Sequence, residues 1–195
     1  TLIIDPGVEI RFAGEYSITL DEGIQAIGTE EEKIIFTSDV VGTTYWKSLN
    51  INGSSLVTNN KYEYVDGNIL KYCVFEYAKQ PINAKSDVYI TKCEFRNNYA
   101  QTAGIWYYDS GLCFSCAFVA IDNVFNNGLV LQSSHNAIFA NNKVLGDFII
   151  ESCSNLTVQD NYFFNSNLDL LYNGYGSIFT ENVFDSLFLR DILQR

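Results

Sequence analysis

The chain has 195 residues, a formal net charge of −11 and a hydrophobic content of 47%. This length suits one domain with a sizeable core, and the hydrophobic content excludes a disordered acidic tail. Because Asp and Glu outnumber Lys and Arg by 23 to 12, binding to nucleic acid through a basic surface is also excluded.

The first 39 residues are predicted to form about two coils of short strands joined by acidic turns. Strand-like segments run from Leu2 to Phe12 and from Ile24 to Asp39, and Glu30 to Glu32 form a solvated turn between strands. No apolar run approaches the ~18 residues of a membrane-spanning helix, so no membrane span is predicted. Residues 40–67 are rich in loop signals but keep several aromatic residues, which favours an irregular stretch around one further coil over a linker.

Regularly spaced asparagine and cysteine residues divide residues 68–195 into short units. An apolar residue stands three positions before each of these anchors, and Phe or Val stands two positions after it. The intervals between anchors are 20, 30, 19, 19 and 21 residues. The anchors are Cys73, Cys93, Asn123, Asn142, Asn161 and Asn182.

A unit of about 20 residues with short alternating strands cannot close a core alone, but stacked units can. Leucine-rich repeats share this period, yet Phe and β-branched residues replace their leucine signature here. The sequence therefore predicts an all-β, right-handed parallel β-helix solenoid of eight to nine coils, each of 19–21 residues. It forms a single domain over residues 1–195, and we expect it to be a segment of a larger protein or assembly.

Equivalent positions of a solenoid lie above one another, so the anchors are expected to form a structural ladder. Stacked asparagine amides can hydrogen-bond to each other and to the turn backbone. Asn also tolerates the left-handed conformation that a tight corner needs, and we expect the anchors to adopt it. Cys73 and Cys93 would begin the ladder as small buried thiols, and Cys153 is the candidate unpaired cysteine.

The 30-residue interval contains an insertion of about ten residues within residues 99–117. Long loops on rigid scaffolds often carry function. Trp106, Tyr107, Tyr108 and Asp109 could form an aromatic platform for a sugar or a partner. Alternatively, part of this run is the strand of its own coil and the rest is a packed cover.

These repeats resemble those of the right-handed parallel β-helix proteins of the pectin-lyase-like superfamily. The opening segments from Leu2 to Phe12 and from Ile24 to Asp39, followed by Trp46, are similar to the first coils of large secreted β-helix proteins. The resemblance implies this fold and an extracellular or cell-surface location. It does not select an activity, because the fold carries lyases, hydrolases, adhesins and structural segments.

Three acidic residues are the candidates for catalysis: Asp122, Asp160 and Glu181. Each stands immediately before an anchor, and Asp160 and Glu181 fall in adjacent coils. Two carboxylates so close could serve glycoside hydrolysis or hold Ca²⁺. However, solvated acids are ordinary at a corner and no basic partner is in register, so no metal site and no cofactor are predicted, with Ca²⁺ as the alternative.

A second candidate for contact is the row four residues before the anchors, which is expected to face outward. It contains β-branched and aromatic residues in every unit: Ile69, Tyr89, Val119, Ile138, Thr157 and Ile178. Large exposed apolar patches mark contacts with partners. Alternatively, the row stabilises the sheet by itself or lies under a loop.

The leading prediction for function is a non-catalytic, secreted or cell-surface β-helix with a structural, adhesive or assembly role. Its expected partners are a protein or polysaccharide at the cell surface, or further copies of itself. The alternative is a carbohydrate-active β-helix, either a polysaccharide lyase or a glycoside hydrolase, or a sugar-binding protein.

Overall fold

The computed structural model describes residues 1–40, 44–99, 113–114, 118–126, 128–132, 135–171, 175–185 and 188–192. Within these ranges the regular secondary structure is β-strand, and no helix occurs. Accordingly, these ranges contain no helix with the length and apolar character needed to cross a membrane.

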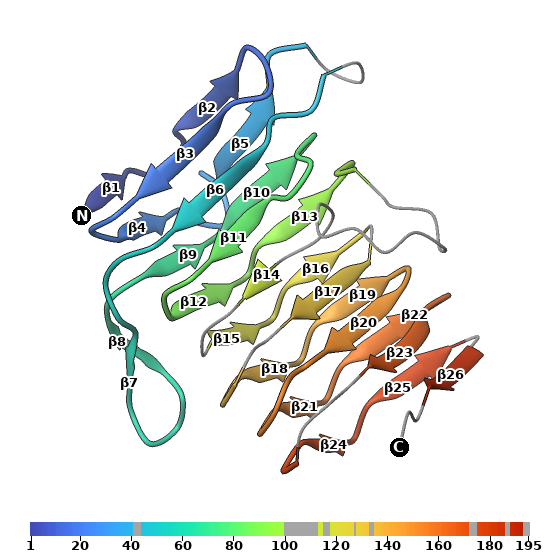
Figure 1. The fold of residues 1–195 in the computed structure, drawn as a ribbon. Coiled ribbons are helices and arrows are strands. Elements are labelled where there is room, and N and C mark those ends of the chain that lie inside the picture. The colour runs from blue at the N-terminus through green and yellow to red at the C-terminus, as the bar shows by residue number, and fades with distance from the viewer. Residues whose placement is uncertain are drawn as a thin grey trace.

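Two long parallel sheets run through the molecule, each with eight strands in the described ranges (Figure 1). Sheet A contains, in spatial order, β1 (Leu2–Ile4), β4 (Ile24–Ile27), β9 (Ile69–Lys71), β12 (Val88–Thr91), β15 (Phe118–Ile121), β18 (Ile138–Ala140), β21 (Thr157–Gln159) and β24 (Ile178–Thr180). Sheet B contains β2 (Glu9–Phe12), β5 (Ile34–Ser38), β10 (Cys73–Glu76), β13 (Glu94–Arg96), β16 (Val124–Phe125), β19 (Lys143–Leu145), β22 (Tyr162–Phe164) and β25 (Val183–Asp185).

Two shorter parallel sheets form a third row of strands (Figure 1). One contains β3 (Ser17–Leu20), β6 (Ser48–Ile51), β11 (Ile82–Ala84) and β14 (Cys113–Phe114). The other contains β17 (Leu129–Gln132), β20 (Phe148–Glu151), β23 (Asn167–Leu171) and β26 (Phe188–Ile192). An antiparallel hairpin of β7 (Val57–Thr58) and β8 (Tyr64–Asp66) forms a separate two-stranded sheet.

The chain visits sheet A, sheet B and the third row in turn and then returns to sheet A one strand further along. For example, β9, β10 and β11 are followed by β12, β13 and β14. The strand pairs within these sheets are parallel, so each winding of the chain places its side chains beside the equivalent side chains of the next winding. The prediction of an all-β stack of parallel strands is confirmed.

The core contains the two apolar rows that flank the anchors, together with the inward residues of the third row of strands, such as Ile82, Leu129 and Phe148. The residues three positions before the anchors pair in register along sheet A, and those two positions after them pair along sheet B. Phe36, Phe75, Phe95 and Phe125 stack with ring centroids 4.8 to 5.0 Å apart. This distance matches the spacing of about 4.8 Å between neighbouring strands, so the rings stay in contact along the stack.

The outward face of sheet A carries a second hydrophobic cluster, which is separate from the core. Ile69, Tyr89, Val119 and Ile138 belong to it, together with Ala140, and all are less than 10% exposed. Leu56 and Tyr64, from the segment that forms the β7–β8 hairpin, pack against this cluster. The rings of Tyr64 and Tyr89 meet edge to face at 5.8 Å. Part of the row is therefore covered by the chain itself.

The corner between sheets A and B depends on a left-handed residue in each winding. This residue is the one immediately before the anchor, and its φ lies between 51° and 61° in Tyr72, Lys92, Asp122, Asn141, Asp160 and Glu181. The expectation that the anchor asparagines adopt this conformation is wrong. The anchor side chain points into the molecule, whereas the residue before it turns the chain and keeps its own side chain outside.

An ion pair links β10 and β13 on the outer face of sheet B. Glu76 and Arg96 pair in register, and Arg96 Nε donates to Glu76 Oε2 at 2.9 Å. Thr37 Oγ1 donates to the other carboxylate oxygen of Glu76, also at 2.9 Å. The Glu76 carboxylate therefore joins three neighbouring strands of sheet B, through Thr37 on one side and Arg96 on the other.

Candidate functional site

The anchor asparagines form a continuous hydrogen-bonded ladder inside the corner. Asn142 Oδ1 accepts bonds from the backbone N–H and from Nδ2 of Asn123, at 2.9 and 3.0 Å. Asn142 Nδ2 donates to Asn161 Oδ1 and to the carbonyl of Ala120, each at 3.0 Å. Asn161 repeats this pattern with Asn182. Each amide thus satisfies the backbone of the preceding winding, which is a structural role.

Cys73 and Cys93 continue the same ladder with sulfur in place of the amide. Cys93 donates its backbone N–H to Asn123 Oδ1 at 2.9 Å, and its own Sγ accepts from the Cys73 N–H at 3.4 Å. The pKa of Cys73 is raised well above its ordinary value, first by the hydrogen bond to the Cys93 thiol and then by burial. Both cysteines are buried and unbridged, as is Cys153.

Two further buried asparagines were missed by the repeat alignment. Asn98 Oδ1 accepts from the backbone N–H of Ala78 at 2.9 Å, and Asn98 Nδ2 donates to the carbonyl of Phe75 at 3.0 Å. Asn68 Oδ1 accepts from the N–H of Ile24, and its Nδ2 donates to the carbonyl of Asp87. They occupy other corners, where the neighbouring windings carry other residue types. Asn97, which precedes Asn98 and is left-handed, is the local signal that could have identified that corner.

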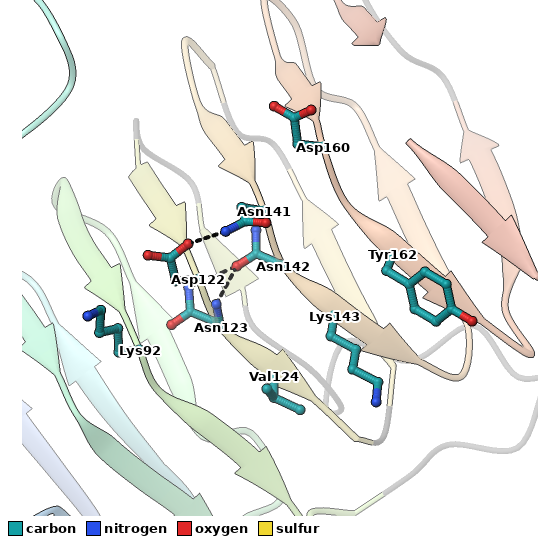
Figure 2. A pocket seen from close by; sticks show the side chains of 9 residues that line it. All are labelled: Lys92, Asp122, Asn123, Val124, Asn141, Asn142, Lys143, Asp160 and Tyr162. Atoms are coloured by element: carbon teal, nitrogen blue, oxygen red, sulfur yellow. Dashed lines mark hydrogen bonds between the residues drawn. The ribbon is translucent and has the colours of Figure 1, made fainter. Parts of the chain in front are cut away.

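An open groove of about 520 Å³ follows the outer side of the ladder, at the corner between sheets A and B (Figure 2). Its lining comes from the residues just before and just after the anchors, with ladder residues between them. The residues before are Lys92, Asp122, Asn141 and Asp160, and those after are Val124, Lys143 and Tyr162; the ladder residues are Asn123 and Asn142.

Contacts among neighbouring side chains organise the wall that precedes the ladder. Asn141 Nδ2 donates to Asp122 Oδ1, from one winding to the next (Figure 2). Lys92 Nζ donates to the Tyr72 hydroxyl at 3.0 Å and lies 5.2 Å from the centre of that ring. The hydrogen bond to Tyr72 is the main reason that the pKa of Lys92 is raised, with Asp122 and Glu30 contributing through their charges. Lys92 is therefore a fixed positive charge at neutral pH.

The other wall ends in an exposed aromatic pair on β22. Tyr162 and Phe164 are 38% and 41% exposed, whereas Phe163 between them is buried in the core. The alternation of a strand places Tyr162 and Phe164 on the same outer face. The Tyr162 hydroxyl donates to Asp185 Oδ2 at 3.1 Å, and this hydrogen bond raises the pKa of Tyr162. The ring is thus neutral and tied to β25.

The structure places the three candidate acids in the left-handed row, with Asp122 and Asp160 in the groove. Asn141 lies between them, so Asp122 and Asp160 are two windings apart. With the usual strand spacing of about 4.8 Å, this corresponds to a separation of about 9.6 Å between the two positions. Glu181 is in the winding after Asp160.

Contrary to the expectation that no basic residue is in register, Lys92 and Lys143 line the same groove. Among the described residues, no group of three or more His, Cys, Asp or Glu side chains could hold a metal ion.

Three of the predicted binding residues, Tyr89, Ile138 and Ile178, lie in one row on sheet A. Trp106, Tyr107, Tyr108 and Asp109 lie outside the described residues. Tyr89 and Ile138 belong to the covered cluster on sheet A, with exposed fractions of 9% and 8%. Ile178, in the same row on β24, is 55% exposed.

Lys143 and Tyr162 were not identified as site residues from the sequence. The rows before each anchor and the apolar row two positions after it were considered, but the row directly after it was not. That row reads Val74, Glu94, Val124, Lys143, Tyr162 and Val183. The signal was therefore present in the sequence, but only the folded corner shows that this row and the row before the anchors share one groove.

Comparison of the chain with protein-family models, with curated proteins and with solved structures identified no match. Its function is therefore inferred from its own geometry and chemistry.

Proposed function

We propose that the chain is a right-handed parallel β-helix, with eight to nine coils of 19–21 residues, of the kind found in the pectin-lyase-like superfamily. We further propose that it works outside the cell or at its surface as a non-catalytic, adhesive module. Its ligand is a polysaccharide that lies in the groove beside the asparagine ladder. The in-register parallel strands and the regular corner support the first part of this proposal.

The observation that carries the adhesive role is the composition of the groove. Carboxylates, amides and ammonium groups that can hydrogen-bond to sugar hydroxyls lie beside the exposed ring of Tyr162, and Phe164 extends the aromatic surface along β22. Aromatic rings offer an apolar face to the C–H groups of a sugar ring, while the polar side chains fix its orientation. This combination supports binding of a carbohydrate over binding of an apolar ligand.

The surroundings of the acids, rather than their spacing, favour binding without catalysis. Glycoside hydrolysis needs two carboxyl groups on opposite sides of one bond, about 5–9.5 Å apart, with one of them held protonated. Asp122 is bonded to Asn141, and Asp160 and Glu181 are solvent-exposed on the same row. Such acids suit hydrogen bonds to hydroxyl groups. We propose no bound Ca²⁺ in the groove, because no group of three or more His, Cys, Asp or Glu side chains is brought together among the described residues.

The experiment is affinity electrophoresis of the chain in gels that contain soluble polysaccharides, with reducing-end release measured on the same polymers. We expect retardation by at least one polymer and no release of reducing ends. Tyr162→Ala should reduce the affinity measured from the retardation about tenfold. We expect a sugar ring to gain a stacking energy similar to that of a base on one aromatic ring, which is ~1–3 kcal/mol. The matched control is Tyr175→Ala, because Tyr175 is 98% exposed and does not line the groove.

Three results would contradict the proposal. Retardation by no polymer rejects the adhesive role, and retardation that survives Tyr162→Ala unchanged places the ligand elsewhere. Release of new reducing or unsaturated ends, abolished by Asp160→Asn, would instead identify a hydrolase or a lyase.

A further inference from the structure

We infer that the polysaccharide bound in the groove is uncharged and lies parallel to the axis of the stack. This inference rests on the proposed function and names the ligand class of that same site. It follows from the balance of charge inside the groove, the charge of the surroundings and the direction in which the groove repeats.

The first step is the charge of the lining. Lys92 and Lys143 carry positive charge, and Asp122 and Asp160 carry negative charge, so the described lining sums to zero. The two signs alternate over the surface, since Lys143 follows the ladder in the winding between those of Asp122 and Asp160. A polyanion along the groove would meet a carboxylate every second winding, and a polycation would meet the ammonium groups. Hydroxyl groups can hydrogen-bond to both kinds of side chain.

The second step is the charge around the groove. The chain has a net charge of −11, and further carboxylates lie close to the lining. Glu30 contributes to the field at Lys92, and Asp185 is bonded to Tyr162. Such a field repels a polyanion at long range and slows its association. A ligand rich in uronate, sulfate or phosphate groups is therefore disfavoured.

The third step is direction. Equivalent groove residues repeat once per winding, at the strand spacing of about 4.8 Å, which is close to the length of one sugar ring in an extended chain. The row from Asp122 through Asn141 to Asp160 therefore offers one polar group to each successive sugar. A polymer across the groove would meet only one or two of these groups. Tyr162 lies on the other side of the ladder from this row (Figure 2), and its exposed ring is available to a sugar in the groove.

The test measures binding of three classes of soluble polymer by affinity electrophoresis at low and at high salt. The neutral class contains glucans, mannans and galactans. The anionic class contains polygalacturonate and alginate, with fully methyl-esterified polygalacturonate as the uncharged partner of the first. The cationic class is chitosan. We expect a neutral polymer to bind best, with an affinity that changes less than about twofold between 50 and 500 mM salt, because no net charge is screened.

A double variant tests whether the carboxylates cause the selectivity. Asp122→Asn combined with Asp160→Asn gives the lining a net positive charge, and Asn is tolerated at both left-handed positions, so the corner should fold. We expect this variant to gain salt-sensitive binding to polygalacturonate of about tenfold over the parent chain. Circular dichroism confirms the fold, and Tyr175→Ala again serves as the control for a surface change away from the groove.

The outcomes separate this inference from the proposed function. Preferential binding of a polyanion or of chitosan by the parent chain, lost in Tyr162→Ala, rejects the uncharged ligand but keeps the adhesive role. Binding of no polymer rejects both. A double variant that folds but gains no polyanion binding rejects the charge balance as the cause of selectivity.

Discussion

Each asparagine of the ladder satisfies backbone groups that would otherwise be buried without partners. The ladder therefore works as a continuous internal cap for the corner. Its contribution to stability is set by the cost of leaving buried polar groups unsatisfied rather than by the strength of one hydrogen bond. Its sulfur rungs have weaker donors and acceptors, yet Cys93 Sγ still points to the carbonyl of Leu70 at 3.4 Å, as the asparagines do in later windings. Residues of similar shape can thus replace one another in the ladder.

The central rung allows a direct test. Asn142→Ala leaves the N–H of Asn123, Oδ1 of Asn161 and the carbonyl of Ala120 without their side-chain partner. We expect a loss of about 2–4 kcal/mol in the free energy of unfolding, measured by urea denaturation. Asn126→Ala, at an exposed position after β16, should change it by less than about 0.5 kcal/mol. Equal effects of the two variants would show that the ladder bonds add little.

Among the larger elements, the β7–β8 hairpin has the clearest role. It brings Leu56 and Tyr64 over the outward face of sheet A and so converts an apolar row into a second, smaller hydrophobic cluster. The sequence suggested both an exposed contact surface and a row covered by a loop. The hairpin decides between them for the windings that it covers, because aromatic burial against Tyr89 removes that surface from partners.

The burial of two tyrosine side chains between the hairpin and sheet A limits the stability of the folded protein at alkaline pH. Burial, with the charges of Asp122 and Glu63, raises the pKa of Tyr89, and burial followed by the charge of Asp66 raises that of Tyr64. The unfolded chain releases these phenolic protons at a lower pH than the folded chain. The stabilisation is therefore complete below the ordinary tyrosine pKa of about 10 and is lost as the pH rises through the folded values.

Tyr89→Phe tests this source of alkaline instability. The variant keeps the ring but removes the proton, so unfolding by alkali, followed by circular dichroism, should shift to higher pH by a few tenths of a unit. Tyr175→Phe, at a fully exposed ring, is the control. An unchanged midpoint in Tyr89→Phe would mean that other groups cause the alkaline transition.

For the molecule as a whole, neighbouring windings supply most of the contacts of each winding. The buried phenylalanine stack joins them, and Phe125 links two parts of it by contacting Phe95 at 4.8 Å and Phe139 at 5.6 Å. The stability of such a stack is close to a sum of windings and of the interfaces between them. A substitution in the core of a middle winding should therefore reduce the local stability of that winding and its neighbours more than that of distant windings.

Phe125→Ala tests this distribution of stability. We expect a loss of about 3–5 kcal/mol, the usual cost of removing a buried aromatic side chain. Amide hydrogen exchange should accelerate most in β13, β16 and β19 and least in the windings furthest from them. The control is Phe164→Ala on the outer face of β22, which should change stability by much less. A uniform acceleration along the chain would show one fully cooperative unit instead.

The spacing of Asn and Cys, with the alternating apolar rows, was sufficient to predict the stack of parallel strands and the side chains that share its core. This worked because a solenoid converts sequence period directly into spatial neighbours. The left-handed residue was assigned one position too late, since Asn suits both an inward rung and a left-handed turn, and only the direction of its side chain distinguishes them. Asn68 and Asn98 were not identified because the equivalent corner positions of the other windings carry other residue types.

The sequence by itself therefore determined which residues stack, through their period, and which rows are apolar. It did not decide which outward rows remain exposed. The hairpin covers part of the row on sheet A, and the turn at each left-handed residue brings Lys143 and Tyr162 to the same groove as Asp122 and Asp160. Which surface the hairpin covers, and which side chains meet in the groove, depend on how the chain bends in three dimensions. The period of the repeat along the chain carries no information about these bends.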